Sequence, residues 1–135
     1  MFFRMHAARK LAAIYAGGAL GAIGRVGLAK ALPHGPDSWP WSTFIVNVGG
    51  ALAIGYLYGS FRDHRPEQLQ HPFLATGICS TLTTFSTLQL EFFAMVEAGY
   101  LRLAAAYCAV TVLAGYLAVV TGLTMERRRA GVLES

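Results

Sequence analysis

Three long stretches of this chain contain no charged side chain. They are residues 38–61, 68–90 and 103–125, and each is 23 or 24 residues long. A helix needs about 20 residues to cross the hydrocarbon core of a bilayer. A fourth stretch, residues 11–29, is apolar except for Arg25. The sequence therefore predicts an all-α membrane protein that forms one domain of four transmembrane helices. The predicted spans are approximately residues 11–32, 41–61, 68–90 and 103–125.

The composition agrees with a membrane protein and excludes several functions. Of the 135 residues, 55% are hydrophobic and 13% are charged, with a mean hydropathy of +0.47. A soluble domain usually has about 25% charged residues. The connections between the spans are too short to hold a soluble active site, and the sequence has no nucleophile–base pair or metal-ligand spacing. We therefore predict a multi-pass protein of the plasma membrane that is neither an enzyme nor a nucleic-acid-binding protein.

Basic residues are distributed unevenly between the two sides of the predicted helices. The side with both termini and the second connection has eight Lys and Arg residues, and the other side has at most three. The eight are Arg4, Arg9, Lys10, Arg62, Arg65, Arg127, Arg128 and Arg129, and the three are Arg25, Lys30 and Arg102. The positive-inside rule then predicts that both termini are cytoplasmic. We also expect the basic flanks to bind anionic lipid headgroups.

The centre of the third charge-free stretch is dense in hydroxyl groups. Residues 80–87, STLTTFST, contain six Ser or Thr residues. Bonds from a hydroxyl to the carbonyl four residues earlier explain one or two of them. Six cannot share one face of a straight helix, so a local break near the bilayer midplane explains them better. At such a break, hydroxyls and freed carbonyls satisfy one another, or line a wet cavity or a bound ion. Phe85 adds a ring whose positive edge attracts anions.

The other three spans carry small or polar residues at four-residue spacing. These are Gly17, Gly21 and Arg25 in the first span, Thr43, Asn47, Ala51, Gly55 and Gly59 in the second, and Tyr107, Thr111 and Gly115 in the fourth. Small residues at this spacing predict close helix contacts. Arg25 either extends to the membrane interface or has a structural or ion-attracting role, and Asn47 either joins helices or faces a solute.

Most of these polar groups are hydrogen-bond donors, which favours an anion. No Asp or Glu precedes Asp37, and Glu91 and Glu97 lie at the end of the third span. A proton-coupled cation exporter generally needs a carboxylate inside the bilayer. A passive pathway for a small anion is therefore favoured. The alternatives are a small four-helix multidrug-type exporter, for which the first span lacks an acidic residue, and a non-transporting membrane assembly subunit, which leaves the hydroxyls unexplained.

Three motifs in order resemble the CrcB/Fluc family of fluoride channels over the whole chain. They are GGALGAIGR, STFIVNVGG and GICSTLTTFSTLQLE. The resemblance implies a passive fluoride-selective channel that exports fluoride and lowers its toxicity in the cytoplasm. It implies an antiparallel dimer with a broken third helix in each subunit, two fluoride pathways, and a structural sodium ion at the dimer interface.

The resemblance also implies site residues. Its fluoride pathway would comprise Arg25, Asn47, Thr84, Phe85, Ser86, Tyr107 and Thr111. The backbone carbonyls of Ser80 and Thr83 would hold sodium, and Glu91 matches the acid that closes the third motif.

Two positions depart from the family pattern. Ser80 and Thr81 stand where a pair of glycines is usual, and Leu88 stands where a second pore phenylalanine is usual. Leu88 cannot present an aromatic edge to an anion. The charge bias also disfavours insertion of one chain in both orientations. Beside the expected homodimer, these features lead to the hypothesis of a heterodimer with a paralogous subunit of opposite bias.

Overall fold

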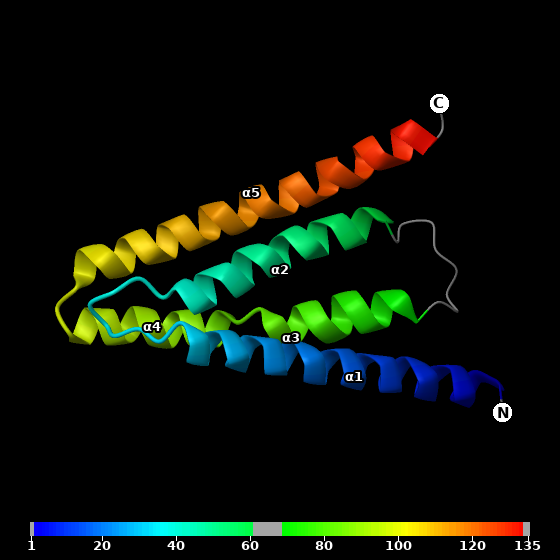
Figure 1. The fold of residues 1–135 in the computed structure, drawn as a ribbon, viewed down its shortest axis with the longest axis horizontal. Coiled ribbons are helices and arrows are strands. Elements are labelled where there is room, and N and C mark those ends of the chain that lie inside the picture. The colour runs from blue at the N-terminus through cyan, green and yellow to red at the C-terminus, as the bar shows by residue number, and fades with distance from the viewer. Residues whose placement is uncertain (1, 61–68, 134–135) are drawn as a thin grey trace.

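Figure 1 shows helical segments lying side by side, with both termini at the same end of the bundle. The computed structural model describes residues 2–60 and 69–133, which contain helices and no strand. The helices are α1 (Phe2–Ala31), α2 (Trp41–Ser60), α3 (Ser80–Leu82), α4 (Phe85–Glu97) and α5 (Leu101–Leu133). A π-helical segment, η1 (Pro72–Cys79), continues directly into α3. The predicted all-helical class is confirmed.

Three helices are long and apolar enough to cross a membrane. They contain Met5–Ala31, Trp41–Ser60 and Leu101–Arg129. The third apolar stretch of the sequence is instead divided among η1, α3 and α4. The ends of the predicted spans at residues 61 and 68, together with Arg62 and Arg65, lie outside the described residues.

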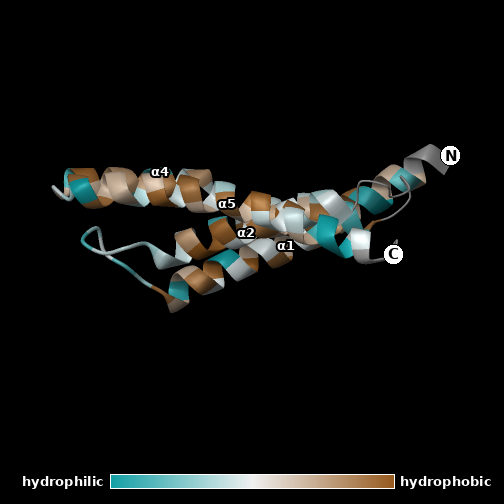
Figure 2. Cartoon of the chain, turned by 90° about the horizontal axis from the view of Figure 1, so that it is seen from above, coloured by the Kyte–Doolittle hydropathy of each residue, from teal (hydrophilic) through white to brown (hydrophobic). Residues whose placement is uncertain are grey.

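The two terminal helices extend beyond the apolar stretches that predict them. Helix α1 has 30 residues and α5 has 33, because nothing in the flanking basic segments ends a helix. The connection between α1 and α2 is different, since Pro33, Pro36 and Pro40 interrupt the helical pattern there. Figure 2 shows hydrophobic colour over much of the helices and hydrophilic colour in this connection and toward the helix ends.

Glycines allow two pairs of elements to pack with their backbones in contact. On α1, a Cβ added at Gly17 would overlap the carbonyl oxygen of Phe73 in η1. On α2, a Cβ at Gly55 would lie 3.0 Å from the Cα of Val119 in α5. The close contacts predicted from the small residues of the first two spans are therefore confirmed at these glycines. Gly115 on α5 differs, because nothing lies within 4 Å of a Cβ added there.

A tight turn joins α4 to α5. Gly99 has a φ of 85°, the left-handed conformation that glycine adopts most easily. The N–H of Gly99 donates to the carbonyl of Val96, and the N–H of Tyr100 donates to that of Met95. This pair of bonds is the Schellman motif, which satisfies the last carbonyls of a helix. The turn lets α4 pack against α5, where Leu88, Met95, Ala104 and Tyr107 form a buried cluster.

Candidate functional site

Thr83 and Thr84 interrupt the helical backbone between α3 and α4. Thr83 has a ψ of 151°, and Thr84 has φ and ψ of −150° and 119°, so both residues are extended. The Thr84 side chain caps α4, because its hydroxyl oxygen accepts from the Thr87 N–H at 3.1 Å. This interruption lies within the hydroxyl-rich segment of residues 80–87.

Several hydroxyls of this segment donate to nearby carbonyls. The Thr83 hydroxyl donates to the Cys79 carbonyl at 2.9 Å. The Thr81 hydroxyl donates to Gly18 of α1 at 2.9 Å and also to Gly77 at 3.0 Å. A threonine at position 81 therefore links α3 to α1. The departure from glycine at this position adds a hydrogen bond between two elements.

Asn47 of α2 supports the interruption with both ends of its side-chain amide. The Asn47 Nδ2–H donates to the Thr84 carbonyl at 3.0 Å, and the Thr84 N–H donates to Asn47 Oδ1 at 2.8 Å. An unpaired backbone group inside a membrane costs several kcal/mol, so this amide replaces partners that a continuous helix would supply. Nδ2 retains a second N–H, which these two bonds do not use.

The two carbonyls of Ser80 and Thr83 are released from the helical bonding pattern. In a continuous α-helix, each N–H donates to the carbonyl four residues earlier. Thr84 N–H would then bond Ser80, but it donates to Asn47. Thr87 N–H would bond Thr83, but it donates to the Thr84 hydroxyl. Released carbonyl oxygens are the ligands that discontinuous membrane helices offer to sodium ions. The described residues contain no cluster of His, Cys, Asp and Glu that could hold a metal.

Glu91 of α4 accepts hydrogen bonds from three other parts of the fold. Its Oε1 accepts from the Thr43 hydroxyl of α2 at 2.7 Å, and its Oε2 accepts from the Tyr107 hydroxyl of α5 at 2.7 Å. His34 Nε2, from the connection between α1 and α2, lies 3.1 Å from Oε1. Hydrogen bonds to an ionised group are stronger than those between neutral groups. Glu91 thus joins α2, α4, α5 and the first connection.

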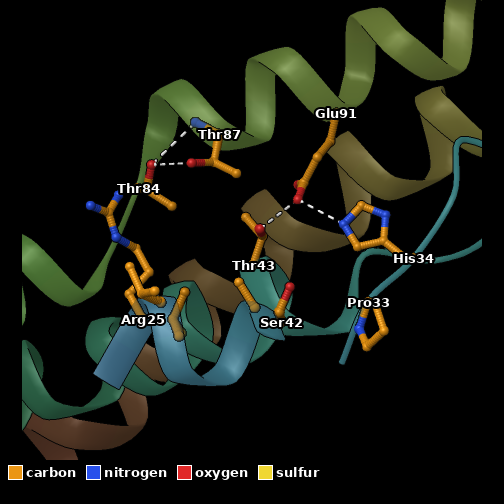
Figure 3. Close-up of a pocket in the computed structure, with 11 residues that line it drawn as sticks. Arg25, Pro33, His34, Ser42, Thr43, Thr84, Thr87 and Glu91 are labelled. Carbon is orange, nitrogen blue, oxygen red and sulfur yellow. Dashed lines mark hydrogen bonds and ion pairs between the residues drawn. The ribbon is translucent and has the colours of Figure 1, made fainter. Parts of the chain in front are cut away.

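A pocket of about 480 Å³ opens beside this carboxylate (Figure 3). We call it the Arg25 pocket, and its lining residues are Arg25, Val26, Ala29, Pro33, His34, Ser42, Thr43, Val46, Thr84, Thr87 and Glu91. It combines one guanidinium, one carboxylate, one imidazole and several hydroxyls. Such a pocket can attract a small anion through Arg25 and can replace water around it with hydroxyl donors.

A second pocket of about 340 Å³ lies on another side of Thr84. We call it the Phe85 pocket, and it is lined by Asn47, Ala51, Ile54, Thr83, Thr84, Phe85 and Val119. Thr84 lines both pockets. The interruption therefore lies between a charged pocket and one with an amide and an aromatic ring.

Similarity to known proteins identifies the family of this chain. Residues 12–123 match the family model described as CrcB-like protein, Camphor Resistance (CrcB). The chain belongs to the CrcB family. A relative from Mycobacterium tuberculosis (strain CDC 1551 / Oshkosh), named Fluoride-specific ion channel FluC 1, is 45% identical over 91% of this chain and 94% of its own length.

Relatives of lower identity from other bacteria have a similar name. The Fluoride-specific ion channel FluC of Hyphomonas neptunium is 42% identical over 83% of this chain and 91% of its own length. That of Azotobacter vinelandii is 38% identical over 85% of this chain and 94% of its own length. The similarity therefore extends over most of each protein.

Phe85 and Leu88 lie in opposite environments in this CrcB chain. The Phe85 side chain is 71% exposed and lines the Phe85 pocket. Leu88 is 6% exposed and packs in the cluster with Met95 and Tyr107. In this structure, position 88 is thus a packing position between α4 and α5.

The remaining residues implied by the resemblance do not line the Arg25 pocket or the Phe85 pocket. Tyr107 is fully buried and donates to Glu91. Thr111 is 5% exposed, and its hydroxyl has no hydrogen-bond partner within residues 2–60 and 69–133. Ser80 and Ser86 are exposed. Ser86 Oγ lies 3.3 Å from the Thr84 hydroxyl oxygen.

Sequence reasoning missed His34, Ser42 and Thr87, which line the Arg25 pocket. Thr87 was visible only as one of six hydroxyls, and its N–H and hydroxyl both contact the Thr84 hydroxyl. His34 gives no signal in the sequence, because 57 residues separate it from its partner Glu91. Ser42 adjoins the Thr43–Asn47 stripe and faces the Arg25 pocket (Figure 3).

Proposed function

We propose that this chain is a subunit of a passive fluoride-selective channel that lets fluoride leave the cell and so lowers its toxicity. The observation that carries the proposal is membership of the CrcB family, with relatives named as fluoride-specific ion channels at up to 45% identity over 91% of the chain. The three apolar helices support a multi-pass location in the plasma membrane.

The proposed pathway uses donors in place of the water around fluoride. Arg25 attracts the anion into its pocket, the Thr84 region connects this pocket to the Phe85 pocket, and the free N–H of Asn47 meets the anion there. The Thr111 hydroxyl, which has no hydrogen-bond partner among the described residues, offers a further donor. The proposed pathway residues are Arg25, Asn47, Thr84, Phe85, Ser86, Tyr107 and Thr111.

We infer that η1, α3 and α4 cross the membrane together as one helix broken near the midplane. The extended Thr83 and Thr84 support this inference, and so does their place near the middle of the charge-free stretch of residues 68–90. Exposed hydroxyls at Ser80 and Ser86 beside an open backbone cannot face lipid without cost. This argues that a second subunit covers the face, which supports the antiparallel dimer.

A structural sodium ion at that dimer interface is part of the proposal. The released carbonyls of Ser80 and Thr83 are the residues that would hold it, and oxygen ligands suit this cation. The ion would supply positive charge that fixes the extended backbone. Replacing sodium by N-methylglucamine during purification is expected to lower the thermal stability of the protein, and an unchanged midpoint would argue against the site.

The dimer of identical chains has an alternative in a heterodimer with a paralogous subunit. The eight-to-three charge bias of the sequence and the Leu88 position both motivate it. Expression of this chain alone, followed by reconstitution into vesicles, separates the two. Robust fluoride efflux from the single purified product would count against an obligatory partner.

The central experiment compares fluoride with chloride efflux from vesicles that contain the purified protein. We expect fluoride efflux well above that of protein-free vesicles and no chloride efflux above this background. Equal fluxes of the two anions, or no fluoride flux in any subunit combination, would contradict the proposed function.

A further inference from the structure

His34 reaches from the connection between α1 and α2 to the carboxylate of α4. Its Nε2 lies 3.1 Å from Glu91 Oε1, and the two side chains are 22% and 10% exposed. Figure 3 shows the imidazole pointing at Glu91 from the side opposite to Thr84. The connection that carries His34 is held to the pathway by this contact.

The His34–Glu91 pair stands between two pockets. Both residues line the Arg25 pocket. Both also line a third pocket of about 250 Å³, together with Gly35, Pro36, Leu90, Ala94 and Met95. In the proposed pathway, an ion that enters from this end of the bundle would pass close to the pair before it reaches Thr84.

Both ring nitrogens of His34 face acceptor oxygens. A carboxylate only accepts, so Nε2 is assigned as the donor to Glu91. Nδ1 lies 3.4 Å from the carbonyl oxygen of Gly35. Only the imidazolium form has an N–H on both nitrogens. His34 can therefore gain a proton without losing the contact with Glu91, which changes a hydrogen bond into an ion pair.

The charge near the pocket depends on that proton. The other titratable groups near the pair are Arg25 of α1, which lines the same pocket, Asp37 of the same connection, which lies beside Gly35, and the Tyr107 hydroxyl of α5, which donates to Glu91. With neutral His34, Glu91 has a hydrogen bond but no ion pair to this residue, so its negative charge stands beside the proposed path of an anion. With imidazolium, this charge is paired and repels fluoride less.

We propose that His34 is a positioning residue for Glu91 and that protonation of His34 speeds fluoride passage. The inference rests on the proposed function and adds a pH-dependent control to it. Glu91 keeps its bonds to Thr43 and Tyr107 in both states, so only its net charge toward the pocket changes.

The test measures fluoride efflux from vesicles at equal internal and external pH, at pH 6 and at pH 8. We expect wild-type efflux to be about two- to fivefold faster at pH 6 than at pH 8, after subtraction of protein-free vesicles. His34→Gln keeps a donor without the charge and is expected to give the slow rate at both pH values. His34→Arg keeps the charge and is expected to give the fast rate at both.

Two controls separate this effect from general titration. His6→Gln changes a histidine near the N-terminus of α1, far along the helix from residue 34, and should keep the wild-type ratio of rates. Glu91→Gln removes the charge that His34 pairs with, so its ratio should be near one. A wild-type ratio in His34→Gln would overturn the inference and leave the proposed function intact.

Imidazole ¹⁵N spectra of the purified protein test the pair without ion flux. The His34 signals are expected to shift in Glu91→Gln, whereas those of His6 should not. Unchanged His34 signals would overturn the pairing by themselves. Absence of fluoride efflux at both pH values in the wild type would instead overturn the proposed function, and with it the effect on passage.

Discussion

The helices α2 and α5 and the segment from η1 to α4 arise from apolar stretches of similar length. Of these, only α2 and α5 are continuous helices. Gly55 and Gly122 bring the backbones of α2 and α5 together, and each helix keeps its internal hydrogen bonds. The other segment uses glycine in the same way where η1 meets α1, but its backbone opens at Thr83 and Thr84. The difference shows that close packing at glycines holds the helices together. Hydroxyl and amide hydrogen-bond partners allow the backbone to leave the helical conformation.

The largest expected effect comes from the amide that supports the opening. Asn47→Asp replaces the donor to the Thr84 carbonyl with a negative oxygen and adds a charge at membrane depth. A charge there costs about 3 kcal/mol, so we expect fluoride efflux to fall about a hundredfold. The rate of fluoride efflux from vesicles measures this effect, on variant protein that elutes from size-exclusion chromatography like the wild type. Unaltered flux would remove Asn47 from the pathway.

The continuous contact can be broken with a single methyl group. Gly55→Ala places a Cβ against the Val119 backbone, which cannot move without shifting α5. We expect a loss of about 3 kcal/mol in the free energy of unfolding. Gly115→Ala is the matched control, because its Cβ would enter open space and should raise helix stability by about 0.5–1 kcal/mol. Equal effects of the two variants on thermal unfolding in detergent would contradict the backbone contact.

Introducing a phenylalanine at position 88 tests whether this position packs against α5 or reaches the proposed pathway. Leu88→Phe would overpack the cluster around Met95, so we expect a loss of about 1–2 kcal/mol in unfolding free energy without faster fluoride efflux. Unfolding and efflux are measured on the same preparation. A gain in efflux would show that position 88 reaches the pathway.

The smallest expected effect tests the role of Thr84 as the N-cap of α4. Thr84→Ala removes the oxygen that accepts from the Thr87 N–H and should cost about 1 kcal/mol. Thr84→Ser keeps the hydroxyl and serves as its control. Equal unfolding midpoints for the two variants would argue against a capping role.

Much of this fold follows from local sequence patterns. The charge-free stretches predict the apolar helices, and the Gly17 and Gly55 stripes predict the close contacts, since both signals repeat along one helix. The hydroxyl-rich segment of residues 80–87 drew attention to the place where the backbone opens. These features depend on neighbours within a few residues, which a sequence states directly.

The contacts of Glu91 did not follow from the sequence. Its partners His34, Thr43 and Tyr107 belong to three other elements, and no spacing connects them. The environment of Leu88 was also inaccessible, because the resemblance aligns the residue but not the direction of its side chain. Such features depend on the orientation of each helix about its own axis, and this orientation is set by packing between helices.

The lengths of α1 and α5 have a consequence for how the protein sits across a bilayer. At 1.5 Å per residue, their 30 and 33 residues span about 45 and 50 Å, against about 30 Å of hydrocarbon. Both helices carry their arginine-rich ends on one side of the bundle (Figure 1). In the proposed antiparallel pair, each membrane face would then display two helical stalks, one from α1 and one from α5 of the same subunit. Trypsin added to only one side of a sealed vesicle would cut half of the stalks.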